Sequence, residues 1–175
     1  MTTGTGFDLA FGTYDEAAAM IGTRSAAQPA DFEVCRGMIR HFCAMVHDPS
    51  PAYWDDEWAT QRWGGVVSPP AMTMVWLMPI EWRPGDGHAP PRLPALVPLP
   101  GTSLINVSND AEFHAPLLVG EQLEVIEELV NVSPEKRTGL GVGHFVTTRA
   151  QYRSATSARV YATITNVMLR FTPGQ

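Results

Sequence analysis

The sequence predicts one α+β domain in which a short apolar helix is wrapped by an antiparallel β-sheet. Residues 71–78, AMTMVWLM, contain a single polar side chain, Thr73, so a helix formed there has no face suited to solvent. Residues 102–171 carry β-branched and aromatic residues in runs separated by turn signals, which is typical of strands. The chain has 175 residues, of which 45% are hydrophobic, enough for one domain with a sizeable core.

Composition excludes several classes of function. The formal net charge of -6 argues against a nucleic-acid-binding protein, which normally carries a basic footprint. No apolar run approaches the roughly 20 residues of a membrane-spanning helix, and residues 1–12 lack the features of a secretion signal, so we expect a cytoplasmic protein. Cys35 and Cys43 lie eight residues apart inside a helical pattern, which fits neither a zinc site nor a disulfide framework; we expect core thiols.

The N-terminal part is predicted to be helical after a loose arm over residues 1–12. Thr13 and Glu16 have the spacing of a capping box and predict a short helix that ends at Gly22. A longer amphipathic helix is predicted over residues 29–46. Its apolar side chains recur three and four residues apart: Phe32, Cys35, Met38, Ile39, Phe42 and Val46.

The central helix is predicted to begin at a proline corner. Proline is tolerated in a first helical turn, where its missing N–H would be unpaired anyway, so Pro69 and Pro70 permit a helix over residues 69–78. A helical turn over residues 55–62 should lead into it. The following excursion, residues 79–102, holds seven of the chain's 15 prolines, and we expect it to be long and irregular.

Four strands are predicted in the C-terminal part of the chain. They cover residues 103–114, 120–132, 141–153 and 158–171. Short connections between successive strands favour an antiparallel meander, which we expect to curl around the central helix. The glycines at 139, 141 and 143 precede a strand and not a helix, so they do not indicate a phosphate-binding loop.

The stretch DPSPAYWD, residues 48–55, is the strongest candidate for a catalytic loop. A carboxylate held in a proline-stiffened loop before a buried segment can be desolvated and positioned, as a general base requires. Taken alone, Asp48 before Pro49 equally fits a turn former, and Tyr53 and Trp54 fit lid packing.

No metal site is indicated. Glu112 and His114 have the spacing to share one strand face, but two ligands without a third do not make a site. Tryptophans are compatible with either the core or the wall of an acyl pocket, and Trp82, in the proline-rich excursion, is the better candidate for the wall.

Four motifs, in this order, resemble the MaoC-type hot-dog dehydratases over roughly residues 13–173. They are Asp48-x-Ser50-Pro51-x-Tyr53-x-Asp55, Gly65-Val-Val-Ser68-Pro69-Pro70-Ala-Met72, Phe113-His114-x-Pro116-Leu-x-x-Gly120-Glu121 and Leu140-Gly-x-Gly143. Within this family the chain is most similar to the dehydratase-like subunit of actinobacterial steroid side-chain enoyl-CoA hydratases. The resemblance implies a hot-dog fold, sheets joined edge to edge in dimers, and an active site at the interface.

In that family a D-x-N-P-x-H loop supplies an Asp and a His, which handle the water that adds to, or leaves from, a trans-2-enoyl thioester. This chain has Asp48 at the Asp position, Ser50 in place of Asn and Tyr53 in place of His. Tyrosine has a usual pKa near 10, against about 6.5 for histidine, and is a poor proton shuttle at neutral pH. The steroid-type subunit also carries Tyr there and obtains its Asp and His from a smaller hot-dog partner.

The resemblance therefore implies a hydratase subunit that needs no cofactor or metal. We expect Asp48 and Tyr53 to hold the catalytic positions in degenerate form. Contacts to an acyl-CoA or acyl-carrier thioester are expected from Gly65, Ser68, Pro69, Met72, Trp76 and Trp82.

Alternatives are a self-sufficient dehydratase, an acyl-CoA thioesterase, and a non-catalytic acyl-binding or scaffold subunit, because fold alone does not choose between them. Each is compatible with a homodimer or with a hetero-oligomer that contains a hot-dog partner. The long excursion favours a bulky acyl group, steroid- or polyketide-like, and is also compatible with an interface element.

Overall fold

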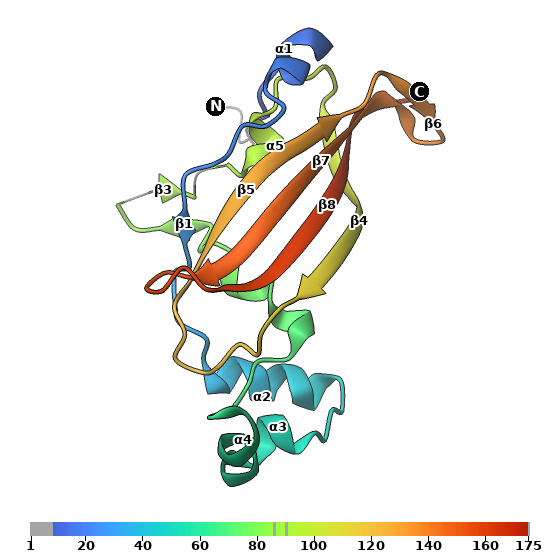
Figure 1. Cartoon of the computed structure of the whole chain (residues 1–175). Coiled ribbons are helices and arrows are strands. Elements are labelled where there is room, and N and C mark those ends of the chain that lie inside the picture. Colours follow the sequence, from blue (N-terminus) through green and yellow to red (C-terminus); the bar gives the residue numbers. More distant parts are fainter. Residues whose placement is uncertain (1–8, 86, 90, 175) are drawn as a thin grey trace.

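The described residues form a curved six-stranded antiparallel sheet, with short helices gathered at its two ends, and a separate two-stranded ribbon (Figure 1). The computed structural model describes residues 9–85, 87–89 and 91–174, so most of the predicted N-terminal arm lies outside the described residues. Figure 1 places α1 and α5 near one end of the sheet and α2, α3 and α4 beyond the other. The helices are α1 (Tyr14–Ala19), α2 (Arg36–Met45), α3 (Pro51–Trp54), α4 (Asp56–Trp63) and α5 (Leu93–Leu96). The predicted α+β class is confirmed.

The main sheet has the strand order β1-β5-β7-β8-β4, with β6 added beside β7. Its strands are β1 (Gln28–Pro29), β4 (Ser103–Phe113), β5 (Leu123–Val132), β6 (Lys136–Thr138), β7 (Gly141–Ser154) and β8 (Val160–Pro173). All four predicted strands are present within a few residues of their predicted bounds. The short strands β1 and β6 were not predicted.

The predicted meander is wrong for its first strand, because β4 pairs with β8 and not with β5. Only β5, β7 and β8 follow one another as neighbours. The segment between β4 and β5 is not a hairpin, since its backbone forms hydrogen bonds with other parts of the chain. Ser68 N donates to Leu117 O (2.7 Å) and Gly120 N donates to Val34 O (2.8 Å). The sequence therefore crosses one end of the sheet between Phe113 and Leu123.

Helix α1 confirms the predicted capping box, with Thr13 and Glu16 satisfying each other's backbone N–H groups. Helix α2 is shorter than predicted and begins at Arg36 instead of residue 29. The preceding segment adds to the edge of the sheet, where Ala30 N donates to Leu123 O (2.8 Å). A backbone committed to β5 cannot also form a helix, which delays the start of α2.

Helix α4 confirms the predicted helical turn at residues 55–62. The Asp55 side chain caps it by accepting from Trp58 N (3.0 Å), and the helix ends at Gly64 with φ 86°. This left-handed conformation suits glycine, which has no Cβ to clash. The four-residue helix α3 starts at Pro51, inside the segment predicted as a loop.

The predicted helix over residues 69–78 is wrong in its regularity: the segment forms two 3-10 turns, η1 (Pro70–Met72) and η2 (Val75–Leu77). Pro79 forces the residue before it into an extended conformation, and Met78 has ψ 120°. The Thr73 hydroxyl donates to Pro70 O (2.9 Å), which competes with helical pairing. The segment is also not enclosed on all sides, since Met78 is 63% exposed.

The proline-rich excursion is more ordered than predicted. It contains the two-stranded ribbon β2 (Trp82–Arg83) and β3 (Gly87–His88), followed by α5. The guanidinium of Arg92 binds the buried carboxylate of Glu127 on β5, with Nη2–Oε1 3.0 Å and Nε–Oε2 3.2 Å. Arg92 also donates to Leu77 O (3.4 Å). The Arg92 side chain thus connects the proline-rich excursion to the sheet and to residues 69–78, which we call the central segment.

The core lies between the concave inner face of the sheet and the segments that cross it. One cluster joins the central segment to β5, β7 and β8 and includes Ile39, Met72, Trp76, Val125 and Ile164. A second cluster packs α1 and α5 against the other end of the sheet and includes Ala17, Leu93, Leu99, Leu129 and Val146. Both cysteines are free thiols, Cys43 fully buried and Cys35 half-buried.

Strand β4 is the least covered part of the sheet. Alternate residues of β5 are buried, whereas every residue of β4 from Ile105 to Phe113 is exposed, including Val107 at 49% and Phe113 at 50%. The central segment covers the inner face over β5, β7 and part of β8 and stops short of β4. The sheet therefore ends in a long edge strand with an open inner face. Nowhere in the described ranges is a helix long and apolar enough to cross a membrane.

Candidate active site

Asp48 sits in a tight turn directly after α2. The turn begins at His47, whose φ of 56° ends the helix, and Asp48 N donates back to Cys43 O (2.8 Å). The Asp48 carboxylate accepts from Ser50 N (3.0 Å), a side chain-to-backbone bond that fixes its direction. The predicted turn role and the predicted positioned carboxylate are therefore both present in one residue.

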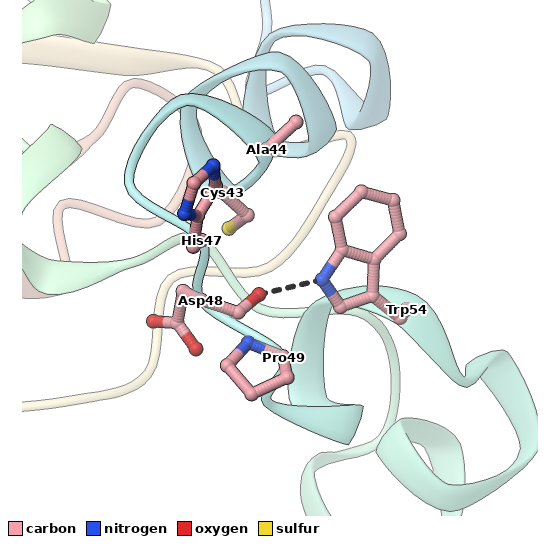
Figure 2. Close-up of a pocket in the computed structure, with 6 residues that line it drawn as sticks. All are labelled: Cys43, Ala44, His47, Asp48, Pro49 and Trp54. Atoms are coloured by element: carbon pink, nitrogen blue, oxygen red, sulfur yellow. Dashed lines mark hydrogen bonds between the residues drawn. The ribbon is translucent and has the colours of Figure 1, made fainter.

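An open pocket lies beside this turn (Figure 2). Its volume is about 450 Å³, and it is lined by Cys43, Ala44, His47, Asp48, Pro49 and Trp54. The Trp54 indole N–H donates to Asp48 O (2.8 Å), so the ring forms one wall, while His47 and Cys43 lie on the opposite side. Figure 2 shows the Asp48 carboxylate pointing away from the indole. The pocket thus combines a carboxylate, an imidazole and an apolar wall.

Tyr53 is half-buried and packs against the core beneath this turn. Burial raises the pKa of its phenol above the usual value, and the nearby Asp48 carboxylate and Cys43 thiol raise it further. Burial likewise raises the pKa of the Cys43 thiol, with a smaller contribution from Asp48. Tyr53 is therefore a neutral hydrogen-bond donor at physiological pH, and Cys43 is a neutral thiol.

Four of the six predicted substrate-binding residues lie in or at the start of the central segment, and all four are buried: Ser68, Pro69, Met72 and Trp76. The Trp76 indole N–H donates to Ser68 Oγ (2.9 Å), and Trp76 and Met72 are 0% and 2% exposed. This burial gives them a packing role, because the bond satisfies both polar groups inside the core. Their contact with a thioester stays a prediction.

The other two predicted substrate-binding residues, Gly65 and Trp82, lie apart from these four buried residues. Gly65 is half-buried and lies just before a bridge between Val67 and Leu118. Trp82 lies in the β2–β3 ribbon, is 59% exposed and belongs to neither core cluster. Its role as a pocket wall stays a prediction.

Sequence reasoning missed a pair of polar residues below the end of β4. The Tyr161 hydroxyl donates to Glu121 Oε2 (2.5 Å), while Ser154 Oγ donates to Glu121 Oε1 (2.8 Å). Burial and then the bond to Glu121 raise the pKa of Tyr161 to about 12. The two residues are 40 apart in the sequence, so no local spacing could have paired them. This pair locks the turn between β7 and β8 onto the connection that follows β4.

His114 is an exposed residue just beyond β4, with Nε2 2.9 Å from Thr163 Oγ1. No third ligand joins His114 and Glu112: in the described part of the chain no three side chains of His, Cys, Asp or Glu converge as a metal site would need. The pocket beside Asp48 is also lined by Cys43 and His47, but these side chains do not converge with the Asp48 carboxylate as a zinc site in a protein would need.

The sequence is similar to proteins of known name. The family model of the FAS1-like dehydratase domain region matches residues 19–163. The "Probable enoyl-CoA hydratase alpha subunit" of Thermomonospora curvata is 36% identical over 144 residues, which cover 78% of this chain and 44% of that protein. The 3-oxo-4,17-pregnadiene-20-carboxyl-CoA hydratase alpha subunit of Mycobacterium tuberculosis is 32% identical over 137 residues, covering 75% and 44%. The chain thus spans less than half the length of these two relatives.

The fold is similar to solved hot-dog proteins. The crystal structure of the ChsH1-ChsH2 complex from Mycobacterium tuberculosis superposes with a TM-score of 0.74 at 26% identity, over 91% of this chain and 96% of that one. A MaoC-like dehydratase from Rhodospirillum rubrum gives 0.59 at 20% identity, over 89% and 94%. The (R)-hydratase of A. caviae gives 0.59 at 14% identity, over 87% and 96%. The predicted hot-dog fold is confirmed.

Proposed function

Because the chain belongs to the family of FAS1-like dehydratase domain regions, we propose that it is one subunit of a two-subunit enoyl-CoA hydratase. In this proposal the chain binds a bulky acyl thioester, and a smaller hot-dog partner supplies the Asp and His that carry out proton transfer. Two relatives are named as alpha subunits of such hydratases, and a similar solved structure is a complex of two proteins.

The observation that carries the proposal is the incomplete acid–base pair in the loop after α2. Hydration adds the hydroxyl of water to the β-carbon of the enoyl thioester and a proton to the α-carbon, so one group must remove a proton while another delivers one. Asp48 can accept a proton. Tyr53, whose pKa is raised by burial and by Asp48, cannot exchange one readily near neutral pH. The loop therefore holds one half of the machinery.

The free edge of the sheet supports assembly with a partner. Strand β4 is the last strand in the order β1-β5-β7-β8-β4, so one of its sides has no strand beside it among the described residues. Exposed apolar side chains, Ile105, Val107 and Phe113, accompany this free edge. A long exposed edge with apolar side chains is a ready template for another strand. Joining a partner's sheet at β4 would cover it.

The open inner face of β4 supports a bulky acyl group. The central segment forms only two 3-10 turns and leaves the concave side of β4 uncovered. Met74 and Met78, 38% and 63% exposed, lie on this segment, and methionine adapts its shape to irregular apolar ligands. An apolar, uncovered concave surface next to a partner's catalytic loop suits a large, rigid acyl group.

The test is reconstitution with a small hot-dog protein that carries the Asp and His of the family's catalytic loop. Trans-2-enoyl-CoA substrates are added to each chain alone and to the mixture, while loss of the enoyl absorbance and release of free thiol are followed in parallel. The proposal expects loss of the enoyl absorbance only with the mixture or the partner, and no thiol release. Thiol release by this chain alone would instead identify a thioesterase. Binding of acyl-CoA without turnover in any arrangement would identify a non-catalytic subunit.

Three variants, two in the pocket and one at Tyr53 beneath it, separate a partner-assisted site from a self-sufficient one. Asp48→Asn and Tyr53→Phe should each change the turnover of the complex by less than about 10-fold, the cost of losing one hydrogen bond. His47→Gln should also be mild, although His47 is the titratable side chain beside Asp48 in the pocket. A loss of about 10²-fold or more in Asp48→Asn or His47→Gln, with the complex still assembled, would show that this chain carries its own acid–base pair.

A further inference from the structure

A line of uncharged polar side chains crosses the inner face of the sheet, from β7 through β8 to the open inner face of β4. The register places Thr148 of β7 opposite Asn166 of β8, and Asn166 opposite Asn109 of β4. Asn106 joins this line across the bulge in β4: its Nδ2 donates to Asn109 Oδ1 (3.1 Å) and to Asn166 Oδ1 (2.8 Å). The three asparagines form what we call the amide cluster.

The amide cluster stands where a sheet of this kind normally presents apolar side chains. The neighbouring inner-face positions on either side are apolar: Val146 and Met168 in one direction, Ala150, Ile164 and Ala111 in the other. Polar residues at positions patterned for the core are expected at functional or strained sites. The cluster therefore calls for a binding explanation.

The cluster has hydrogen-bonding capacity that the chain leaves unused. Each asparagine amide offers two donors and one acceptor, and Asn106 spends both donors inside the cluster. No described residue accepts from Nδ2 of Asn109 or of Asn166, and Thr148 Oγ1 is buried without any partner. Exposure increases outward along the line, from 1% at Thr148 through the half-buried Asn166 to the exposed Asn109. The unpaired amide groups of Asn109 and Asn166 thus lie toward the open inner face of β4.

No charge accompanies these amides. Asp110 and Glu112 alternate with the inner-face residues of β4 and so project to the other face of the sheet. The ionisable side chains nearest in register on the inner face are Glu127, His144 and Arg170, which are 5%, 3% and 1% exposed, and Glu127 is paired with Arg92. Arg170 is held by the backbone oxygens of Ala10, Leu99 and Gly101. Neutral amides on an apolar surface suit a neutral polar group, because a charged one would lose its hydration without a counter-charge.

We propose that the amide cluster binds an uncharged oxygen substituent, a ketone or a hydroxyl, at the end of the acyl group remote from the thioester. This inference rests on the proposed function and names a feature of its substrate. A relative at 32% identity is named for a 3-oxo steroid carboxyl-CoA, which carries such an oxygen.

The position of the cluster along β4 fits this role. The C-terminal end of β4, at Phe113, points toward the end of the molecule that holds α2, α3 and the Asp48 turn (Figure 1). A strand rises about 3.3 Å per residue, so Asn109 lies about 13 Å up the strand from Phe113. A long, rigid acyl group can therefore span the open inner face from the thioester end to the amides.

The test uses three thioesters that differ at one ring position: 3-oxo-4,17-pregnadiene-20-carboxyl-CoA, its 3-hydroxy analogue and its 3-deoxo analogue. Hydration or binding is measured for the reconstituted complex containing wild-type chain, Asn109→Leu or Asn166→Leu. Each variant should lower kcat/KM for the two oxygenated thioesters about 3- to 10-fold per lost hydrogen bond, and change the 3-deoxo value by less than about 2-fold. Thr165→Val is the matched control, since Thr165 neighbours Asn166 on the other face of the same strand.

Asn109→Asp distinguishes the two oxygen groups while nearly preserving shape. A carboxylate cannot donate to a ketone but still accepts from a hydroxyl, so the 3-oxo thioester should lose more than the 3-hydroxy one. Circular dichroism and the 3-deoxo thioester report whether each variant is folded and assembled. Equal effects on all three thioesters, or none, would overturn the amide-cluster assignment. If no thioester is bound by the wild-type complex, the proposed function fails first and the assignment fails with it.

Discussion

Replacing Glu127 by Gln should destabilise the protein strongly, because it breaks a buried ion pair on one side only. Glu127 is 5% exposed and accepts from Arg92 Nε, Arg92 Nη2 and Leu93 N at 3.0–3.2 Å. Removing one partner of a fully buried pair costs about 3–5 kcal/mol. The Arg92 side chain is 31% exposed, so water offsets part of this, and we expect about 2–3 kcal/mol.

The assay is urea unfolding followed by circular dichroism and tryptophan fluorescence, with thermal unfolding alongside. The expected loss corresponds to a fall in Tm of about 4–12 °C for a chain of this size. Glu128→Gln is the matched control: the adjacent carboxylate binds Arg24, whose side chain is 69% exposed, and its loss should cost at most about 1 kcal/mol. Arg92→Met combined with Glu127→Gln should recover part of the stability, since the unpaired charge is then absent. Equal losses in Glu127→Gln and Glu128→Gln would refute the reasoning.

Two further predictions concern the sheet. The folded pKa of Tyr161, about 12, exceeds its unfolded value near 10, so this contribution to stability is intact below pH 10 and is lost as pH rises toward 12. Tyr161→Phe, which also frees Glu121, should therefore lose less stability than wild type in urea titrations between pH 10 and 12; parallel curves would contradict this. Gly143→Ala should cost about 1–3 kcal/mol or more, because a Cβ there would overlap the backbone oxygen of Arg170. Gly139→Ala, with nothing within 4 Å of the new Cβ, should change the unfolding free energy by less than about 1 kcal/mol.

Structural features that depend only on residues a few positions apart were predictable from the sequence. The capping box at Thr13 and Glu16 depends on residues three positions apart and formed as predicted, and the helical turn predicted over residues 55–62 is present as α4. The Asp48 turn was also found in this way, since its geometry comes from adjacent prolines and one side chain-to-backbone bond. Local chemistry was sufficient in each case because no distant residue takes part.

Features set by distant pairing were not predictable. Ser103 on β4 pairs with Phe171 on β8, and no pattern within either strand specifies that partner over β5. The late start of α2 also results from distant pairing, because Ala30 N donates a hydrogen bond to Leu123 O, far along the chain. The uniform hydrophobicity of residues 71–78 predicted that this segment is partly buried, but it did not predict its conformation. That conformation depends on the flanking prolines and on the hydrogen bond of the Thr73 hydroxyl. The amide cluster became visible only once β4, β7 and β8 were in register.

Two incomplete features of this chain lie far apart in its sequence. The loop at residues 48–53 holds one carboxylate without a titratable partner in Tyr53, and the strand at residues 103–113 ends the sheet without a neighbour. Neither can compensate for the other within one chain, because an unpaired strand edge supplies no proton-transfer group. Under the proposed function one event completes both, since a partner joined along β4 covers the edge and brings its own acid–base loop. Turnover and assembly should then rise together as partner is added, with the same midpoint concentration, whereas two unrelated deficits would give two separate transitions.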